Sequence, residues 1–74
     1  MAVITILSEV AGVVWQVSAQ VGQSLEPDEA VVIVESMKME LPVCTPKAGK
    51  VLQILVSKSD VVAAGDPVAR LDVE

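Results

Sequence analysis

The 74-residue sequence contains no histidine, no phenylalanine and no tyrosine, and only one cysteine and one tryptophan. Without histidine, the chain cannot form a Ser-His-Asp or Cys-His nucleophilic site, and it has no imidazole to bind a metal ion. Cys44 has no second cysteine with which to form a disulfide or a Cys-x-x-Cys metal clip. A single cysteine without a disulfide is typical of proteins of the reducing cytoplasm. The sequence therefore predicts a cytoplasmic chain with no catalytic residues and no metal site.

Basic residues are also scarce, because five Lys and Arg stand against ten Asp and Glu and leave a formal net charge of −5. Affinity for a phosphate backbone depends on Lys and Arg, so nucleic acid is not an expected partner. The longest aliphatic run, residues 30–34 (AVVIV), is far shorter than the roughly 20 residues of a membrane-spanning helix. The first residues, MAVITIL, lack the basic segment of a secretory signal. We expect no membrane partner.

What the sequence does contain is aliphatic residues, above all valine: hydrophobic residues make up 53% of the chain and aromatic residues 1%. Such β-branched side chains pack well on a sheet and lose rotamer freedom in a helix. Turn residues recur every several positions, and between them lie strand-like runs such as ITIL, VVWQVSAQV, AVVIV, LPVC, VLQILV and PVARL. The sequence predicts a single all-β domain over residues 1–74, the size of one small core.

Alternation within the second of these runs predicts which face of its strand is buried. The apolar set is Val13, Trp15, Val17, Ala19 and Val21, and the polar set is Gln16, Ser18 and Gln20. This assignment makes Trp15 a core residue. Cys44 has no base or cation near it in the sequence and is expected to be a small buried or edge hydrophobe. The carboxylates of Glu26, Asp28 and Glu29 lack calcium-binding spacing and are expected to form a solvated turn.

The sequence also repeats itself. A shift of 37 positions aligns AGVVWQV, residues 11–17, with AGKVLQI, residues 48–54. The same shift brings Leu25 onto Val62 and Val31 onto Val68. Each half is too small to bury its apolar face alone, so we expect two four-stranded halves wrapped on one another around a shared core.

The segment between the halves, residues 31–44 (VVIVESMKMELPVC), is strand-like on both sides of Met37-Lys38. It has no Gly, Asn or Asp at its middle, where a tight hairpin normally needs one. A single strand of this length would nevertheless be unusual, so the sequence predicts a hairpin tip at Met37-Lys38. A lysine ammonium is a poor nucleophile until a partner enzyme removes its proton, so we expect Lys38 to accept a modification. Met37 and Met39 would offer that enzyme a flexible apolar contact.

The string Glu35-Ser36-Met37-Lys38-Met39-Glu40 resembles the biotin attachment motif of the biotinyl-domain family, in which the lysine between two methionines is biotinylated. The resemblance covers nearly the whole chain, including Gly12, Gly22, residues 30–35 (AVVIVE), Pro46, Gly65-Asp66 and residues 67–72 (PVARLD). It implies a flattened eight-stranded barrel-sandwich hybrid with two quasi-symmetric halves and no thumb insertion. It also implies a monomeric domain with covalent biotin on Lys38. The family usually has glycine where Asp28 and Ser59 stand, at turns expected to need a positive φ.

The resemblance further implies a carrier without catalytic activity. A biotin protein ligase would attach the biotin, contacting Met37 and Met39. Glu35 and Glu40 either are recognised by this ligase as well or only keep the hairpin soluble. Carboxybiotin would then move from an ATP- and bicarbonate-dependent biotin carboxylase to a carboxyltransferase, as in the carboxylases of fatty acid biosynthesis or in those that act on pyruvate or urea.

Two alternatives stay open at this point. A lipoyl carrier domain shares the fold and the hairpin lysine, but it typically has an acidic residue before the lysine and a small one after it. The flanking methionines here favour biotin. The third hypothesis is an interaction module with an unmodified Lys38.

Overall fold

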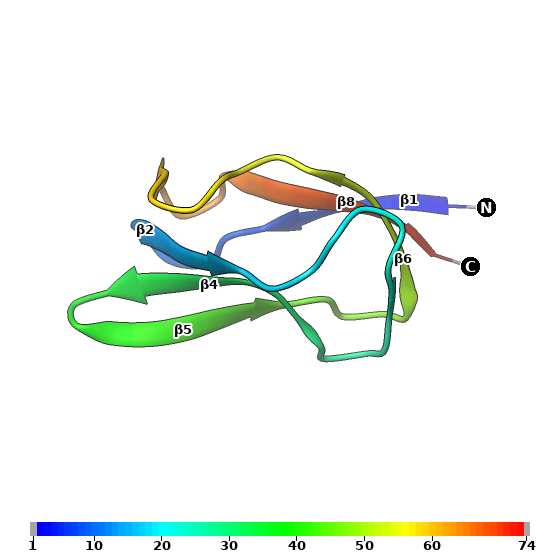
Figure 1. Cartoon of the computed structure of the whole chain (residues 1–74), viewed down its shortest axis with the longest axis horizontal. Coiled ribbons are helices and arrows are strands. Elements are labelled where there is room, and N and C mark those ends of the chain that lie inside the picture. The colour runs from blue at the N-terminus through cyan, green and yellow to red at the C-terminus, as the bar shows by residue number, and fades with distance from the viewer. Residues whose placement is uncertain (1, 74) are drawn as a thin grey trace.

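The computed structural model describes residues 2–73, so residues 1 and 74 of the predicted domain lie outside the described residues. The described part of the chain contains eight strands and no helix, hence none that is long and apolar enough to cross a membrane (Figure 1). The strands are β1 (Ala2–Leu7), β2 (Gly12–Val17), β3 (Ser24–Leu25), β4 (Ala30–Ser36), β5 (Met39–Cys44), β6 (Gly49–Ile54), β7 (Val61–Val62) and β8 (Pro67–Val73). The predicted all-β fold is confirmed.

The strands form two antiparallel four-stranded sheets, in the orders β1-β8-β6-β3 and β5-β4-β2-β7. The predicted repeat is visible in the bounds of the strands, because β1 to β4 recur 37 residues later as β5 to β8. Each sheet takes two strands from each half, so the halves interlock and neither can form a complete sheet alone. The body measures 36 × 17 × 17 Å, and the β4–β5 hairpin lies at the end opposite the start of β1 and the end of β8 (Figure 1).

The core between the sheets is aliphatic, as the composition predicts. Its buried members are Ile6, Val14, Ala19, Leu25, Val31, Val32, Val34, Val43, Val51, Val62, Val68, Ala69, Leu71 and Val73. Burying one such valine or leucine side chain stabilises a fold by about 1.5–3 kcal/mol relative to leaving it exposed. Without large aromatic side chains, this many small contacts are needed to hold the two sheets together.

The assignment of Trp15 to the core is wrong. The pairing of β2 with β4 shifts between Val14 and Gln16, so a β-bulge places both Trp15 and Gln16 opposite Ile33. The bulge resets the alternation: Val14 is buried, whereas Trp15 is 42% and Val13 41% exposed. The period-two pattern holds only along an uninterrupted ladder. β6 repeats the bulge and exposes Leu52.

The repeated Ala-Gly pair reflects close packing of the backbone. A Cβ atom on Gly12 would lie 2.2 Å from the backbone oxygen of Glu35, and one on Gly49 would lie 2.7 Å from that of Asp72. Real Cβ atoms do not approach an oxygen so closely, so both positions need a glycine. Glu35 belongs to the strand that leads into the hairpin, and Gly12 therefore helps to set where the hairpin starts.

The two turns at which the family pattern expects glycine do require a positive φ. Asp28 has a φ of 67° and its repeat partner Gly65 a φ of 93°, while Ser59 has a φ of 77° and its partner Gly22 a φ of 91°. Asp tolerates this left-handed region better than Ser does. The expectation of positive φ at these turns is confirmed.

Two buried hydroxyl groups, which the sequence analysis did not single out, also obey the repeat. The Ser8 Oγ donates to the Val10 carbonyl and the Thr45 Oγ1 donates to the Lys47 carbonyl, each over 2.6 Å. They hold the turns that follow β1 and β5. Among the described residues no buried side-chain nitrogen or oxygen lacks a hydrogen-bond partner.

Candidate functional site

The β4–β5 hairpin turns at the predicted position. Ser36 pairs with Met39, which leaves Met37 and Lys38 as a two-residue loop. The φ angles of these two residues are 51° and 65°. A positive φ at both central residues is typical of a type I′ turn, whose twist matches that of the flanking strands. The hairpin thus forms without the Asn-Gly pair that usually makes such a turn.

The conformation of the tip is strained. A left-handed backbone costs a residue with a side chain roughly 1–2 kcal/mol, and Met37 and Lys38 both adopt one. The cost is offset by the six cross-strand residue pairs of β4 and β5, which run from Ala30 and Cys44 to Ser36 and Met39. Such strain concentrates at functional sites because the surrounding structure must maintain it. The strain therefore indicates that the tip is the functional part of the domain.

The side chains at the tip lie in solvent. Lys38 is exposed, Met37 is 93% exposed and Met39 is 61% exposed. Two large apolar side chains left in water beside one amine have no role in packing this fold. Their flexible thioethers can adapt to the surface of a second protein. The arrangement presents the amine to a partner, together with an apolar surface that the partner can recognise.

Below the tip, the structure brings together the two carboxylates that flank the lysine in the sequence. Glu35 on β4 pairs directly with Glu40 on β5, and both are exposed. Like charges on directly opposite strand positions repel each other. The four residues expected to surround Lys38, namely Glu35, Met37, Met39 and Glu40, therefore lie on one hairpin, as the sequence predicts.

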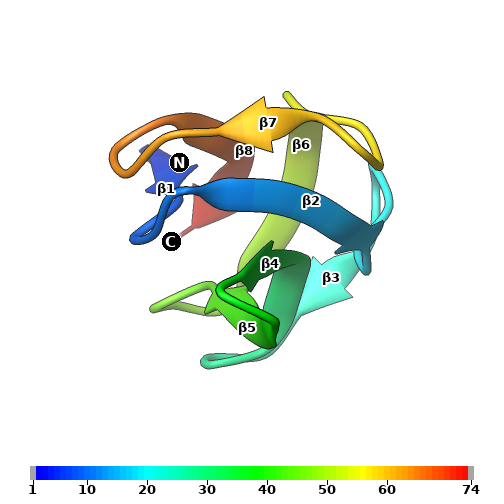
Figure 2. The same ribbon diagram turned by 90° about the vertical axis from the view of Figure 1, so that its left-hand side faces the viewer.

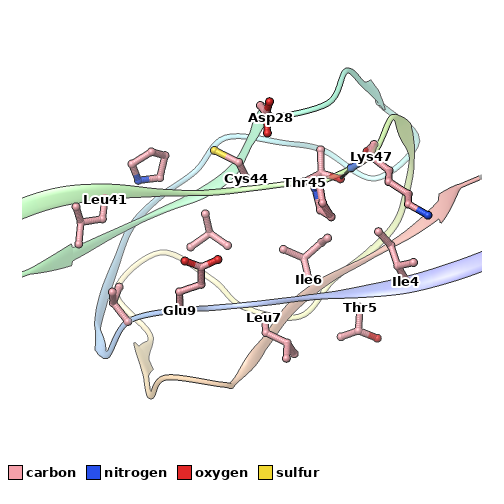
Figure 3. A pocket seen from close by; sticks show the side chains of 14 residues that line it. Ile4, Thr5, Ile6, Leu7, Glu9, Asp28, Leu41, Cys44, Thr45 and Lys47 are labelled. Atoms are coloured by element: carbon pink, nitrogen blue, oxygen red, sulfur yellow. Dashed lines mark hydrogen bonds between the residues drawn. The ribbon is translucent and has the colours of Figure 1, made fainter.

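The other residues considered in the sequence analysis lie away from the tip. A groove of about 840 Å³ opens between β1 and β5, and its lining includes Ile4, Ile6 and Cys44 but not Lys38 (Figure 3). Cys44 is half-buried on the edge strand β5, which confirms the expectation of an edge hydrophobe. In the turn at Pro27, the Glu29 carboxylate accepts a hydrogen bond from the Glu26 backbone over 2.9 Å. Residues 2–73 contain no group of three or more His, Cys, Asp or Glu that could hold a metal ion.

A rigid two-sheet body that holds one strained, exposed lysine at its end defines an attachment domain rather than an active site. Comparison with known proteins agrees: the family model described as "Biotin-requiring enzyme" matches residues 2–71. The chain belongs to this family. Membership confirms the resemblance seen in the sequence, with biotin as the cofactor of the family and a non-catalytic carrier as its role.

Individual relatives are of two sizes. The chain is 34% identical over 67 residues to a biotin/lipoyl attachment protein of Bacillus subtilis, covering 90% of this chain and 92% of that protein. It is 36% identical over 67 residues to urea amidolyase of Saccharomyces cerevisiae, covering 90% of this chain but only 4% of that protein. The crystal structure of Kluyveromyces lactis urea carboxylase superposes with a TM-score of 0.92 at 39% identity, covering 97% of this chain and 6% of that one. The same unit therefore occurs alone and within much longer chains.

Proposed function

We propose that this chain is a biotin carboxyl carrier in which biotin is joined by an amide bond to the Nζ atom of Lys38. The observation that carries the proposal is the position of this lysine between two exposed methionines, at a two-residue hairpin tip of a member of the biotin family. The other lysines, Lys47, Lys50 and Lys58, are exposed as well, but none has a positive φ. Lys50 lies in β6, and Lys47 and Lys58 lie in longer connections between strands, whereas Lys38 stands at the two-residue tip of a hairpin, which can enter the active site of another enzyme.

The attachment chemistry requires a second enzyme. The Lys38 amine attacks the acyl carbon of biotinyl-adenylate, the bond from that carbon to the AMP oxygen breaks, and the nitrogen loses a proton as the amide forms. In this proposal a biotin protein ligase provides both the activated biotin and the base that takes this proton. In this proposal the ligase contacts Met37 and Met39 at the tip and the carboxylates of Glu35 and Glu40 below it.

Once biotin is attached, the Lys38 side chain tethers it to the domain, and the domain carries it between two active sites. A biotin carboxylase adds the carboxyl group and a carboxyltransferase removes it, and a tethered cofactor visits both at a high effective concentration. The placement of the hairpin opposite the start of β1 and the end of β8 lets the tip reach an active site while the body stays outside (Figure 1). The acceptor is chosen by the carboxyltransferase. Acyl-CoA carboxylation for fatty acid biosynthesis and urea carboxylation both fit this carrier, which we place in the cytoplasm as a monomeric domain.

The test compares two cofactors on one lysine. Wild-type chain, Lys38→Arg and the control Lys50→Arg are each expressed with a biotin protein ligase and, separately, with a lipoate ligase. Intact mass should show one biotinyl group on the wild type and on Lys50→Arg, and none on Lys38→Arg. Circular dichroism should be the same for all three. Biotin on Lys38→Arg, a lipoyl group in preference to biotin, or an unmodified wild type would each overturn the proposal.

A further inference from the structure

The groove between β1 and β5 has the dimensions and walls of a small-molecule site. Its volume of about 840 Å³ lies within the range of such sites. Its lining is mostly apolar, and two of its members, Ile6 and Val43, belong to the buried core. Both strands are outermost in their sheets, so the backbone groups on their outer sides are available to a ligand. Apolar walls with a few polar groups suit a small, largely apolar molecule.

The internal repeat places matched residues at the two ends of the groove. β5 corresponds to β1, 37 residues apart, so Leu41 is the counterpart of Ile4 and Lys47 that of Val10. Figure 3 shows Leu41 and Glu9 toward one end of the groove, and Ile4 and Lys47 at the other. Among the described half-buried hydrophobic residues, Ile4 and Val10 pack against the core, whereas Leu41 does not. One end therefore presents an apolar side chain that the core does not use.

This end lies next to the attachment site, and we call it the hairpin end of the groove. β5 begins at Met39, and Leu41 follows Lys38 by three residues, roughly 10 Å along an antiparallel strand. The lysine side chain and the valeryl chain of biotin together span about 12 Å when extended, from bonds of about 1.5 Å in a zigzag. Biotin on Lys38 can therefore turn back along β5 and place its rings in the hairpin end.

The chemistry of the hairpin end fits biotin. The sulfur-containing ring and the valeryl chain are apolar and match the half-buried side chains of Leu41 and Val10. The ureido ring is uncharged and has two N–H donors. Glu9 is exposed, and its carboxylate points from the end of β1 toward β5, where it can accept from these donors (Figure 3). At the other end the corresponding residues are Pro46 and Lys47, which offer a donor in place of an acceptor.

We propose that the hairpin end of the groove holds the biotin of Lys38 between its visits to partner enzymes. This inference rests on the proposed carrier function. The effective concentration of a tethered group is in the millimolar range, so a contact with a Kd of about 1 mM keeps the groove occupied about half of the time. Carboxylation replaces a ureido N–H with an anionic carboxyl group, which the Glu9 carboxylate repels. The groove therefore retains biotin and releases carboxybiotin.

The outer face of the hairpin sheet is another surface close to the tip. Figure 2, which faces the hairpin end of the molecule, shows its strands β7, β2, β4 and β5 side by side in this order. One row of paired residues crosses them, namely Glu40, Glu35, Val13 and Val61, and Trp15 stands in the next row. This face would contact biotin from one side only, whereas the groove contacts it from two strands. Because Trp15 is the single tryptophan of the chain, its fluorescence distinguishes the two surfaces.

The test compares the unmodified and the biotinylated wild-type chain by two-dimensional NMR. Biotinylation should shift the backbone amide signals of Glu9, Val10 and Leu41, and the biotin rings should show NOEs to the methyl groups of Leu41. The fluorescence of Trp15 and its quenching by acrylamide should stay the same. Lys38→Arg treated with the ligase in the same way should show no shift.

Two matched variants locate the contact. Leu41→Ala and Ile4→Ala shorten half-buried side chains at equivalent positions of the repeat, and only the first lies at the hairpin end. A tenfold weaker contact lowers the occupied fraction of the groove from about a half to about a tenth. The shifts that biotinylation causes at Glu9 and Val10 should therefore become about fivefold smaller in Leu41→Ala and stay near the wild type in Ile4→Ala.

Three results would overturn the proposal: shifts confined to residues 37–39, NOEs from biotin to Trp15, or an equal reduction in the two variants. The comparison of the two wild-type forms needs no variant, so it decides the question even if Leu41→Ala does not fold. A wild-type chain that takes up no biotin from the ligase would instead overturn the proposed function.

Discussion

Replacing Met37 with glycine should make the protein more stable. The Met37 side chain is 93% exposed and its φ is 51°, so glycine removes no packing and relieves a left-handed strain of roughly 1–2 kcal/mol. The greater freedom of glycine in the unfolded chain takes back about 0.5–1 kcal/mol. At the middle of both ranges the net gain is about 0.75 kcal/mol, which raises the Tm of a domain of this size by about 3–6 °C.

Met39→Gly is the matched control. Met39 is also exposed and also next to Lys38, but it lies in β5 and does not have a positive φ. Glycine there only adds freedom to the unfolded chain and should lower the stability by about 0.5–1 kcal/mol. Thermal unfolding followed by circular dichroism measures both variants. If Met37→Gly lowers the Tm as Met39→Gly does, the tip is not a strained type I′ turn.

Met37→Gly and Met39→Gly also distinguish the stability of the domain from its recognition by the ligase. We expect both variants to be biotinylated more slowly than the wild type, because each removes a methionine that the ligase is proposed to contact. For Met37→Gly, higher stability and slower labelling would then occur together. Faster labelling of this variant would mean that Met37 contributes nothing to recognition.

Three further outcomes test the scaffold. Gly12→Ala should lower the free energy of unfolding, measured by urea denaturation, by about 1–3 kcal/mol, because the Cβ atom would lie 2.2 Å from a backbone oxygen of β4. An unchanged midpoint of urea denaturation would show that β2 and β4 can move apart at no cost. Ser59→Gly, at a φ of 77°, should raise the midpoint of urea denaturation, whereas Ser57→Gly, where φ is not positive, should lower it. Equal shifts of the two midpoints would argue against strain at Ser59. Fluorescence of Trp15 should be quenched readily by acrylamide in the folded protein, because 42% of the residue is exposed, and an indole protected from the quencher would contradict the bulge.

Local patterns were enough to predict most of this fold. Valine-rich runs between turns indicate strands, and the 37-residue shift predicts the pairing of the halves without knowledge of any contact. The hairpin at Met37-Lys38 follows from strand length and from the repeat, which puts the junction between the halves there, although its residues are poor turn formers. At this tip the pairing of β4 with β5 outweighs the poor turn propensity of Met37 and Lys38. From the sequence this can be inferred only because no neighbouring position offers a better turn.

The failures have one physical origin, the register between strands. Strict alternation predicts Trp15 in the core, but a bulge adds a residue to β2 at this position and turns the side chain outward. The row that joins Glu40, Glu35, Val13 and Val61 could not be read from the sequence either. Its members come from four strands whose pairing depends on how the two halves interlock.

Whether Lys38 carries biotin in the cell is decided by the mass of the chain purified from its natural host. The intact chain should carry one biotinyl group, and a peptide map should place it on the fragment that contains Lys38. A chain that carries a lipoyl group, no group at all, or biotin on Lys47, Lys50 or Lys58 would contradict the assignment of the hairpin tip as the site of attachment.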